Sequence, residues 1–478
     1  MTPKRQIDVI GMPTFTSAIT MVPLAVLLLF FLTSAITIAL IMKRPYLYLR
    51  VLGRNIQLQT YFLGALFGPF LIILFGVLNY HQIIEGIEGT AGLNPIGVLI
   101  LFLSMVFMSI FLDITGFFEY CARLALQYAG GDGRRLFFAL YVVVSVLTTF
   151  TSNDIIVLTF TPFIFYFTRD AGINPRPYLI AEFFAANTWS MMLYIGNPTN
   201  IVLATAFGIG FDRFTSWMFL PTLGAGLTGL AVLYMVFRKE ITQPMAGTYC
   251  VDPSSALSDR QGAYMGLLLL GSCIITLMIA PSYGVEMWIV SLAFALLLLG
   301  ILVIRDYAIA PLRKNKAMPV NHVVTSLYRM PWSIIPFVLS LFVTVEALRI
   351  YGITGEVGAR LSAICGQSPL LVTGVYGITS ALTANVVNNI PMTVAFTSII
   401  RESSTGGLLP AVFATTVGSN LGANLTPLGS LAGIMWMSIL AGKEVRITFR
   451  DFLYYGMLIT PLTLITSLVI LGMEFGLA

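Results

Sequence analysis

Charged and titratable side chains are scarce in this chain. Only 10% of its 478 residues are charged, and only His81 and His322, both in predicted loops, are histidines. The four cysteines form no Cys-x-x-Cys pair, which argues against a disulfide framework and against a zinc site. A Gly-Lys-Thr phosphate loop is also missing. We therefore expect no enzyme, no cofactor and no structural metal, and any ATP hydrolysis would belong to a separate subunit.

Apolar residues, in contrast, make up 57% of the chain, and the mean hydropathy is +0.90. This composition predicts an all-α polytopic membrane protein. The net charge of +5 is no sign of nucleic-acid binding, because basic residues beside spans orient a membrane protein. Single spans are expected near residues 20–42, 60–80, 94–115, 216–237, 263–281, 285–304, 333–350 and 452–476.

Two apolar stretches, residues 136–167 and 371–400, are polar in the middle. As single helices they would be roughly 45–48 Å long, against a hydrocarbon core of about 30 Å. We therefore expect re-entrant hairpins that turn at 151–154 and at 385–389. Non-helical backbone at that depth is tolerated only where it lines a buried cavity.

Two further spans, 178–210 and 409–441, contain helix-breaking residues. Gly196-Asn197-Pro198-Thr199-Asn200 interrupts the first, and Gly422-Ala423-Asn424-Leu425-Thr426-Pro427 interrupts the second. Proline removes a helical N–H, and glycine permits unwound backbone. Because half-helix ends carry partial charges of about half an electron, such breaks can hold a polar or anionic solute and a cation.

The order of these segments repeats. Residues 1–237 and 263–478 each read as three spans, a hairpin, a broken span and a final span, joined by a cytoplasmic linker at 238–262. Five crossings per half, about 10 in all, make the second half an inverted repeat of the first. Most of the 26 basic residues fall in loops on one side, which predicts a plasma or inner membrane protein with both termini outside.

The polar residues at the tips and breaks are the candidate binding residues for substrate and ions. Asp154, at the first tip, is the leading candidate for coupling to a proton or sodium ion, or else caps the returning half-helix. Asp113 and Glu346 are further coupling candidates, or structural anchors paired with Arg123 and Arg349. Glu182 is expected near the cytoplasmic interface. The candidate binding residues are Thr151, Ser152, Asn153, Asp154, Asn197, Thr199, Asn200, Asn388, Asn389, Asn424 and Thr426.

Several of these motifs carry a family resemblance. They are the run 151–154 with Thr161-Pro162, the pair Asn388-Asn389 with Pro391, the segment 420–432, and Asp113 with the run 116–119. In them the chain resembles the ion transporter superfamily of arsenical-pump membrane proteins, sodium/proton antiporters and sodium-coupled dicarboxylate symporters. The arsenical-pump branch is the most similar, over residues 94–441. Ala423 departs from that pattern, because the family has proline there.

The resemblance implies efflux of arsenite or antimonite, driven by protons or by a soluble ATPase partner. Because related carriers often dimerise, it also implies a possible homodimer. Arsenous acid is neutral and carries three hydroxyls, so the asparagine, serine and threonine side chains named above suit it. A sodium-coupled dicarboxylate or other anion transporter, or a sodium/proton antiporter, could use the same residues. A channel-like facilitator without a coupling ion is the alternative of another class.

Overall fold

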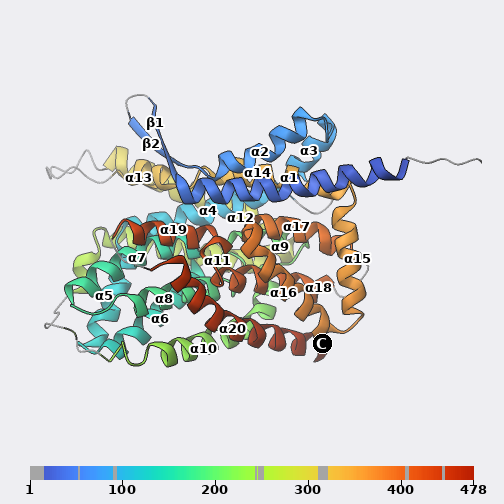
Figure 1. Cartoon of the computed structure of the whole chain (residues 1–478). Coiled ribbons are helices and arrows are strands. Elements are labelled where there is room, and N and C mark those ends of the chain that lie inside the picture. The colour runs from blue at the N-terminus through green and yellow to red at the C-terminus, as the bar shows by residue number, and fades with distance from the viewer. Residues whose placement is uncertain are drawn as a thin grey trace, which may run out of the picture.

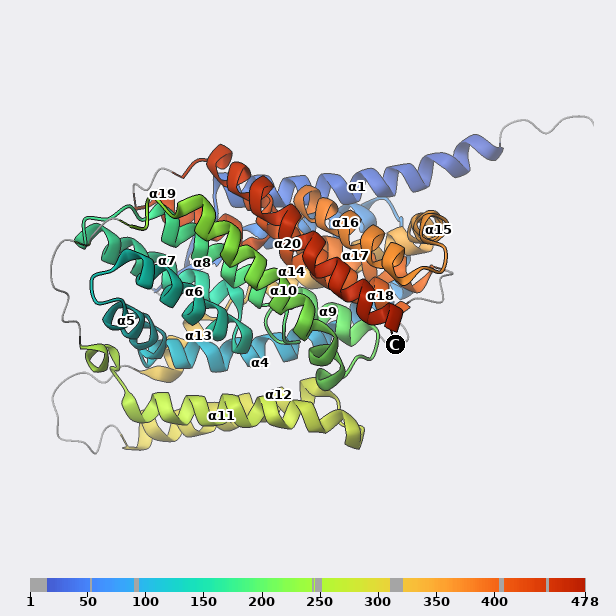
Figure 2. The same ribbon diagram turned by 90° about the horizontal axis from the view of Figure 1, so that it is seen from below.

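The computed structural model describes residues 15–51, 54–89, 94–242, 245, 252–309, 321–403, 408–443 and 447–477. Nearly all of these residues are helical (Figures 1 and 2), which confirms the all-α class predicted from composition. One antiparallel hairpin, β1 (Tyr46–Val51) with β2 (Arg54–Gln59), projects beside α13 in Figure 1. The two chain ends, residues 1–14 and 478, for which the sequence predicts an outer location, lie outside the described residues.

The helices of the two halves follow the same order. Those of the first half are α1 (Phe15–Lys43), α2 (Tyr61–Leu74), α3 (Tyr80–Glu88), α4 (Pro95–Ile114), α5 (Phe117–Ala129), α6 (Gly133–Phe150), α7 (Asn153–Asp170), α8 (Arg176–Trp189), α9 (Pro198–Ala206) and α10 (Phe211–Phe237). Those of the second half are α11 (Arg260–Ile279), α12 (Met287–Val303), α13 (His322–Arg329), α14 (Ile334–Ile350), α15 (Ile353–Cys365), α16 (Pro369–Val387), α17 (Asn389–Arg401), α18 (Leu408–Leu421), α19 (Leu431–Ala441) and α20 (Phe449–Leu477). Short helical turns at Pro253–Ala256, Ala280–Tyr283, Ile304–Ile309, Gly422–Asn424 and Pro427–Gly429 complete the helical segments.

Packing between helices also recurs across the two halves. Helices α2 and α3 of the first half pack against α14, and α12 and α13 of the second half pack against α4. In the same way α7 packs against α19, and α17 packs against α9. Helices of each half therefore pack against helices of the other half. In Figure 2 the pair α11 and α12 lies along one edge of the molecule, and α1 lies along the opposite edge.

Among the described residues, nine helices are long and apolar enough to cross a membrane. They include α6 and α16, the first arms of the two predicted hairpins. The single span expected near 60–80 is not present as one helix, because α2 has only 14 residues and Asn79 caps a separate helix, α3. The side chain of Asn79 accepts from the backbone N–H of Gln82, which is the normal start of a helix.

Local sequence explains where the central helices begin. Proline is the first residue of α4, α9 and α16, where its missing N–H costs nothing. Asn94 and Asn197 precede two of these prolines and accept hydrogen bonds from the backbone of the first turn. Helices α8 and α18 are buried along almost their whole length. The ends of these two helices position the polar residues described next.

Candidate functional site

The first predicted hairpin tip is a sharp break between two helices. Helix α6 ends at Phe150, Thr151 and Ser152 adopt extended or irregular backbone, and α7 begins at Asn153. The hydroxyl of Thr151 donates to the carbonyl of Leu147 in its own helix at 2.6 Å. The backbone N–H of Asn153 donates to the carbonyl of Gly196 at 3.3 Å. The tip is therefore held against the break between α8 and α9.

A cavity of about 730 Å³ opens beside this tip. Ser152 lines it from the tip, Asp154 from the first turn of α7, Tyr61 from α2 and Met435 from α19. The buried Ser152 hydroxyl has no hydrogen-bond partner. Within the described residues, the half-buried carboxylate of Asp154 likewise makes no hydrogen bond or ion pair. The cavity is large enough for a small solute and contains one unpaired acid.

The basic residue in the cavity wall is already paired. Arg329, at the end of α13, forms an ion pair with Asp113 of α4 at 2.5 Å, and Asp113 also accepts from the Thr159 hydroxyl at 3.0 Å. The predicted anchor pair of Asp113 with Arg123 is therefore wrong. Arg123 instead pairs with Glu119, one turn away on the same helix, at 2.5 Å. Among the described residues that line the cavity, Asp154 is therefore the charged residue without an oppositely charged partner.

Behind the tip, amide side chains from both halves form two hydrogen-bonded groups, which are joined where the Ser190 hydroxyl also donates to the backbone carbonyl of Asn187 at 2.9 Å. The Asn153 amide donates to Asn187 of α8 at 2.9 Å, and Asn187 donates to Asn424 at 3.0 Å. The hub is Asn420 of α18. Its oxygen accepts from Ser190 at 3.1 Å and from Asn197 at 2.9 Å, and its nitrogen donates to Asn200 at 2.8 Å.

The remaining candidates complete this network. Thr199 donates to the oxygen of Asn197 at 3.0 Å and accepts from the Ser419 hydroxyl at 3.1 Å. Asn200 also donates to the carbonyls at the end of α8. All of these side chains are almost fully buried. The network joins the two broken segments, and its amides bond one another in this conformation.

The second predicted tip is also tied to its neighbouring break. Asn388 has a φ of 77° and a ψ of 153°, a backbone conformation found almost only at glycine, and its amide donates to the carbonyl of Leu428 at 3.0 Å. Asn389 approaches the carbonyl of Ser419 at 3.5 Å, and Thr426 donates to Asn385 at 2.7 Å. When the two tips are aligned, Asp154 of the first corresponds to the neutral Asn389 of the second. The two tips therefore differ in charge.

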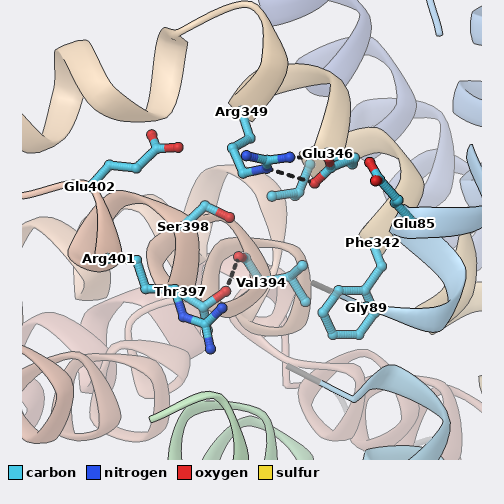
Figure 3. Close-up of a pocket in the computed structure, with 12 residues that line it drawn as sticks. Glu85, Gly89, Phe342, Glu346, Arg349, Val394, Thr397, Ser398, Arg401 and Glu402 are labelled. Atoms are coloured by element: carbon cyan, nitrogen blue, oxygen red, sulfur yellow. Dashed lines mark hydrogen bonds and ion pairs between the residues drawn. The ribbon is translucent and has the colours of Figure 1, made fainter. Parts of the chain in front are cut away.

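A second cavity occupies the corresponding place in the other half, between α3, α14 and α17 (Figure 3). Its volume is only about 50 Å³, enough for a few waters. Glu346 and Arg349 line it and pair with one another at 2.5 Å, as predicted. Arg401, at the end of α17, donates to the carbonyl of Ala206 and lies over the ring of Phe207 at 5.6 Å. This cavity is therefore too small for anything larger than a few waters.

One further acid of the first half is buried between helices, away from the residues that line the cavity. Glu182, expected near the cytoplasmic interface, is only 1% exposed and packs among α7, α8 and α19. It accepts from the Thr161 hydroxyl at 3.0 Å and from the indole N–H of Trp436 at 3.2 Å. Its partners are therefore neutral.

Sequence reasoning missed several residues that the structure brings to the site: Tyr61, Asn187, Ser190, Arg329 and Ser419. A signal was available for Asn187, because Asn187 and Asn420 lie at equivalent points just before the ends of α8 and α18. The other four carry no such signal. Among the described residues, no group of three or more histidine, cysteine or acidic side chains could hold a metal ion.

Comparisons with known proteins agree with this architecture. A family model described as a citrate transporter, CitMHS, matches residues 56–418. The arsenical pump membrane protein of Escherichia coli is 27% identical over 380 residues, which cover 78% of this chain and 86% of that protein. The arsenical pump membrane protein of Yersinia enterocolitica is 26% identical over the same shares.

Two solved structures share the fold. The YdaH transporter of Alcanivorax borkumensis has a TM-score of 0.54 and 15% identity, and the alignment covers 95% of this chain and 98% of that one. The Neisseria gonorrhoeae protein MtrF, described with a class of antimetabolite efflux pumps, has a TM-score of 0.50 and 14% identity, with 97% and 95% covered. Identities this low establish the fold alone.

Proposed function

This chain belongs to the CitMHS citrate transporter family, and we propose that it is a secondary active transporter that exports arsenite or antimonite in exchange for protons. The family assignment and the apolar helices make it a multi-pass membrane transporter. The observation that carries the finer proposal is the cavity beside the first tip, where the unpaired carboxylate of Asp154 meets the free hydroxyl of Ser152.

The charge of this cavity favours a neutral solute. Arg329 is neutralised by Asp113, so Asp154 faces an entering solute without a free cation among the described lining residues. An anion would meet like charge in a partly buried site, which is unfavourable. Arsenous acid is neutral at physiological pH and can donate to a carboxylate and accept from a hydroxyl. The same carboxylate can take up a proton when the solute leaves.

Two unequal cavities in corresponding positions support alternating access. The larger cavity lies among α4, α7 and α13, and the smaller lies among their counterparts α14, α17 and α3. If the halves are inverted repeats, the two cavities face opposite sides of the membrane, and an exchange of their shapes would move the solute across. On the predicted topology, this conformation is open to the cytoplasm through the Asp154 cavity.

Citrate, or another carboxylate accompanied by a cation, is the second candidate solute, because the family model is that of a citrate transporter. In that case the cation would bind at Asp154 and offset the charge of the carboxylate. Both candidates use the same cavity, and they differ in the charge of the transported species.

The test is transport by purified protein in liposomes with an imposed proton or sodium gradient. Arsenite, antimonite, citrate and succinate are each supplied, with protein-free liposomes as the control. Uphill movement of arsenite or antimonite driven by protons supports the proposal. Sodium-driven uptake of citrate or succinate without arsenite movement would overturn it, and downhill flux that ignores both gradients would identify a facilitator.

A further inference from the structure

Glu182 is a buried acid that the proposed transport cycle leaves unused. It lies on α8 with 1% of its surface exposed, and both of its oxygens face the Thr161 hydroxyl of α7, at 3.0 and 3.2 Å. The indole of Trp436 on α19 donates to the same carboxyl at 3.2 Å. A carboxyl group at this depth is therefore held by two neutral donors from two other helices.

Aromatic rings close the space around it. Phe183 lies 5.2 Å from the ring of Trp436 and 5.2 Å from that of Phe452, and the rings of Trp436 and Phe452 are 5.7 Å apart. Glu182 itself, next to Phe183 in the chain and bonded to Trp436, is almost completely shielded from solvent. A buried carboxylate without a cation or water is strongly disfavoured relative to its protonated form.

Charged groups on the surrounding helices do not compensate it. Within the described residues, none of the titratable groups of α6, α7, α8, α10, α19 and α20 makes an ion pair with Glu182, and its hydrogen bonds are those to Thr161 and Trp436. The titratable groups that these helices carry are Arg134, Arg135, Tyr141, Asp154, Tyr166, Arg169, Asp170, Arg176, Tyr178, Asp212, Arg213, Tyr234, Arg450, Asp451, Tyr454, Tyr455 and Glu474.

The position of Glu182 links it to the cavity. Leu158 of α7 and Met435 of α19 line the cavity, and Thr161 and Trp436 lie one turn and one residue further along the same helices. Glu182 is thus behind the wall that α7 and α19 form together. These helices come from different halves of the chain, so a relative movement of the halves would separate them and admit water.

From this arrangement we propose that Glu182 is a second proton-binding site, separate from Asp154. It takes up a proton from the outer side when α7 and α19 part, holds it while they are packed together, and releases it to water in the cavity on the cytoplasmic side. The reaction is a simple ionisation of the carboxyl group, and water or buffer accepts the proton. The inference rests on the proposed transport function, because it adds one proton to each solute that is moved.

The first measurement is the number of protons exchanged per antimonite moved, from reversal potentials in liposomes with set proton and solute gradients. We compare the wild-type chain with Glu182→Gln, which keeps the size and acceptor of the side chain, and with Trp436→Phe. Glu182→Gln is expected to lower the count by one. Trp436→Phe removes a donor that favours the ionised form, so its transport profile should shift to higher pH.

The second measurement is independent of transport. Infrared difference spectra of the purified wild-type chain follow protonated carboxyl groups as antimonite is added and as pH is raised. We expect a buried carboxyl band that is lost in Glu182→Gln and kept in Asp154→Asn. An unchanged proton count in a folded Glu182→Gln protein, or a wild-type band that only Asp154→Asn removes, would overturn the inference. If the wild-type chain moves no solute but shows the band lost in Glu182→Gln, the transport proposal fails while the proton site stands.

Discussion

The amide hub at Asn420 offers the sharpest test of how the two halves are held together. Its side chain bonds Ser190, Asn197 and Asn200, all from the first half of the chain. Interhelical hydrogen bonds in membrane proteins contribute about 0.6 kcal/mol each on average. A buried amide left without a partner costs about 1–3 kcal/mol. Asn420→Ala breaks three such bonds and leaves the Asn197 amide unpaired, so we expect a loss of about 3–5 kcal/mol.

The matched control is Thr415→Val on the same helix. Thr415 is equally buried, but its hydroxyl bonds only the carbonyl of Ala411 within α18. We expect this change to cost less than about 1 kcal/mol. The free energy of unfolding is measured for both purified variants in mild detergent with a denaturing detergent added. If Asn420→Ala is as stable as Thr415→Val, the network does not hold the halves together and the reasoning fails.

Three further changes test other parts of the site. Asp154→Asn should abolish uphill, proton-driven transport but keep downhill exchange in liposomes, and unchanged uphill transport would remove the coupling role of Asp154. Arg329→Gln leaves the carboxylate of Asp113, which is 9% exposed, without its ion pair and should destabilise the protein by about 1–3 kcal/mol. Arg123→Gln should cost only about 0–1 kcal/mol, because its partner Glu119 is 44% exposed, and equal thermal midpoints would contradict this. Gly196→Ala places a methyl group against the Ser190 backbone and should cost about 1–3 kcal/mol, whereas Gly271→Ala points into open space and should not destabilise; chemical denaturation distinguishes them.

The breaks in the helices could be predicted from the sequence, because proline, glycine and asparagine affect the backbone locally. Asn197-Pro198 starts α9 by the same cap and first-turn proline that start α4 at Asn94-Pro95. The short α2 was missed because hydropathy continues past its end, and the change to a separate helix depends on a single cap at Asn79. Whether the hairpins are re-entrant and the halves inverted stays a prediction, supported by the repeated order of helices.

Side-chain partners were harder to predict than helices. Arg123, the predicted partner of Asp113, lies only ten positions away in the sequence. The actual partner of Asp113 is Arg329, which comes from the other half of the chain. The partners of Glu182 were not predicted for a similar reason, since Trp436, which donates to it, comes from the second half. Contacts between the halves are set by tertiary packing, and no local pattern in the sequence records which residues will meet.

The most direct test of the central claim is anomalous X-ray diffraction from crystals of the wild-type chain soaked with antimonite. The account predicts an antimony peak inside the cavity beside Ser152 and Asp154, and the loss of that peak in Asp154→Asn crystals of the same form. An antimony peak at a cysteine such as Cys121 or Cys273, with none in the cavity, would contradict it.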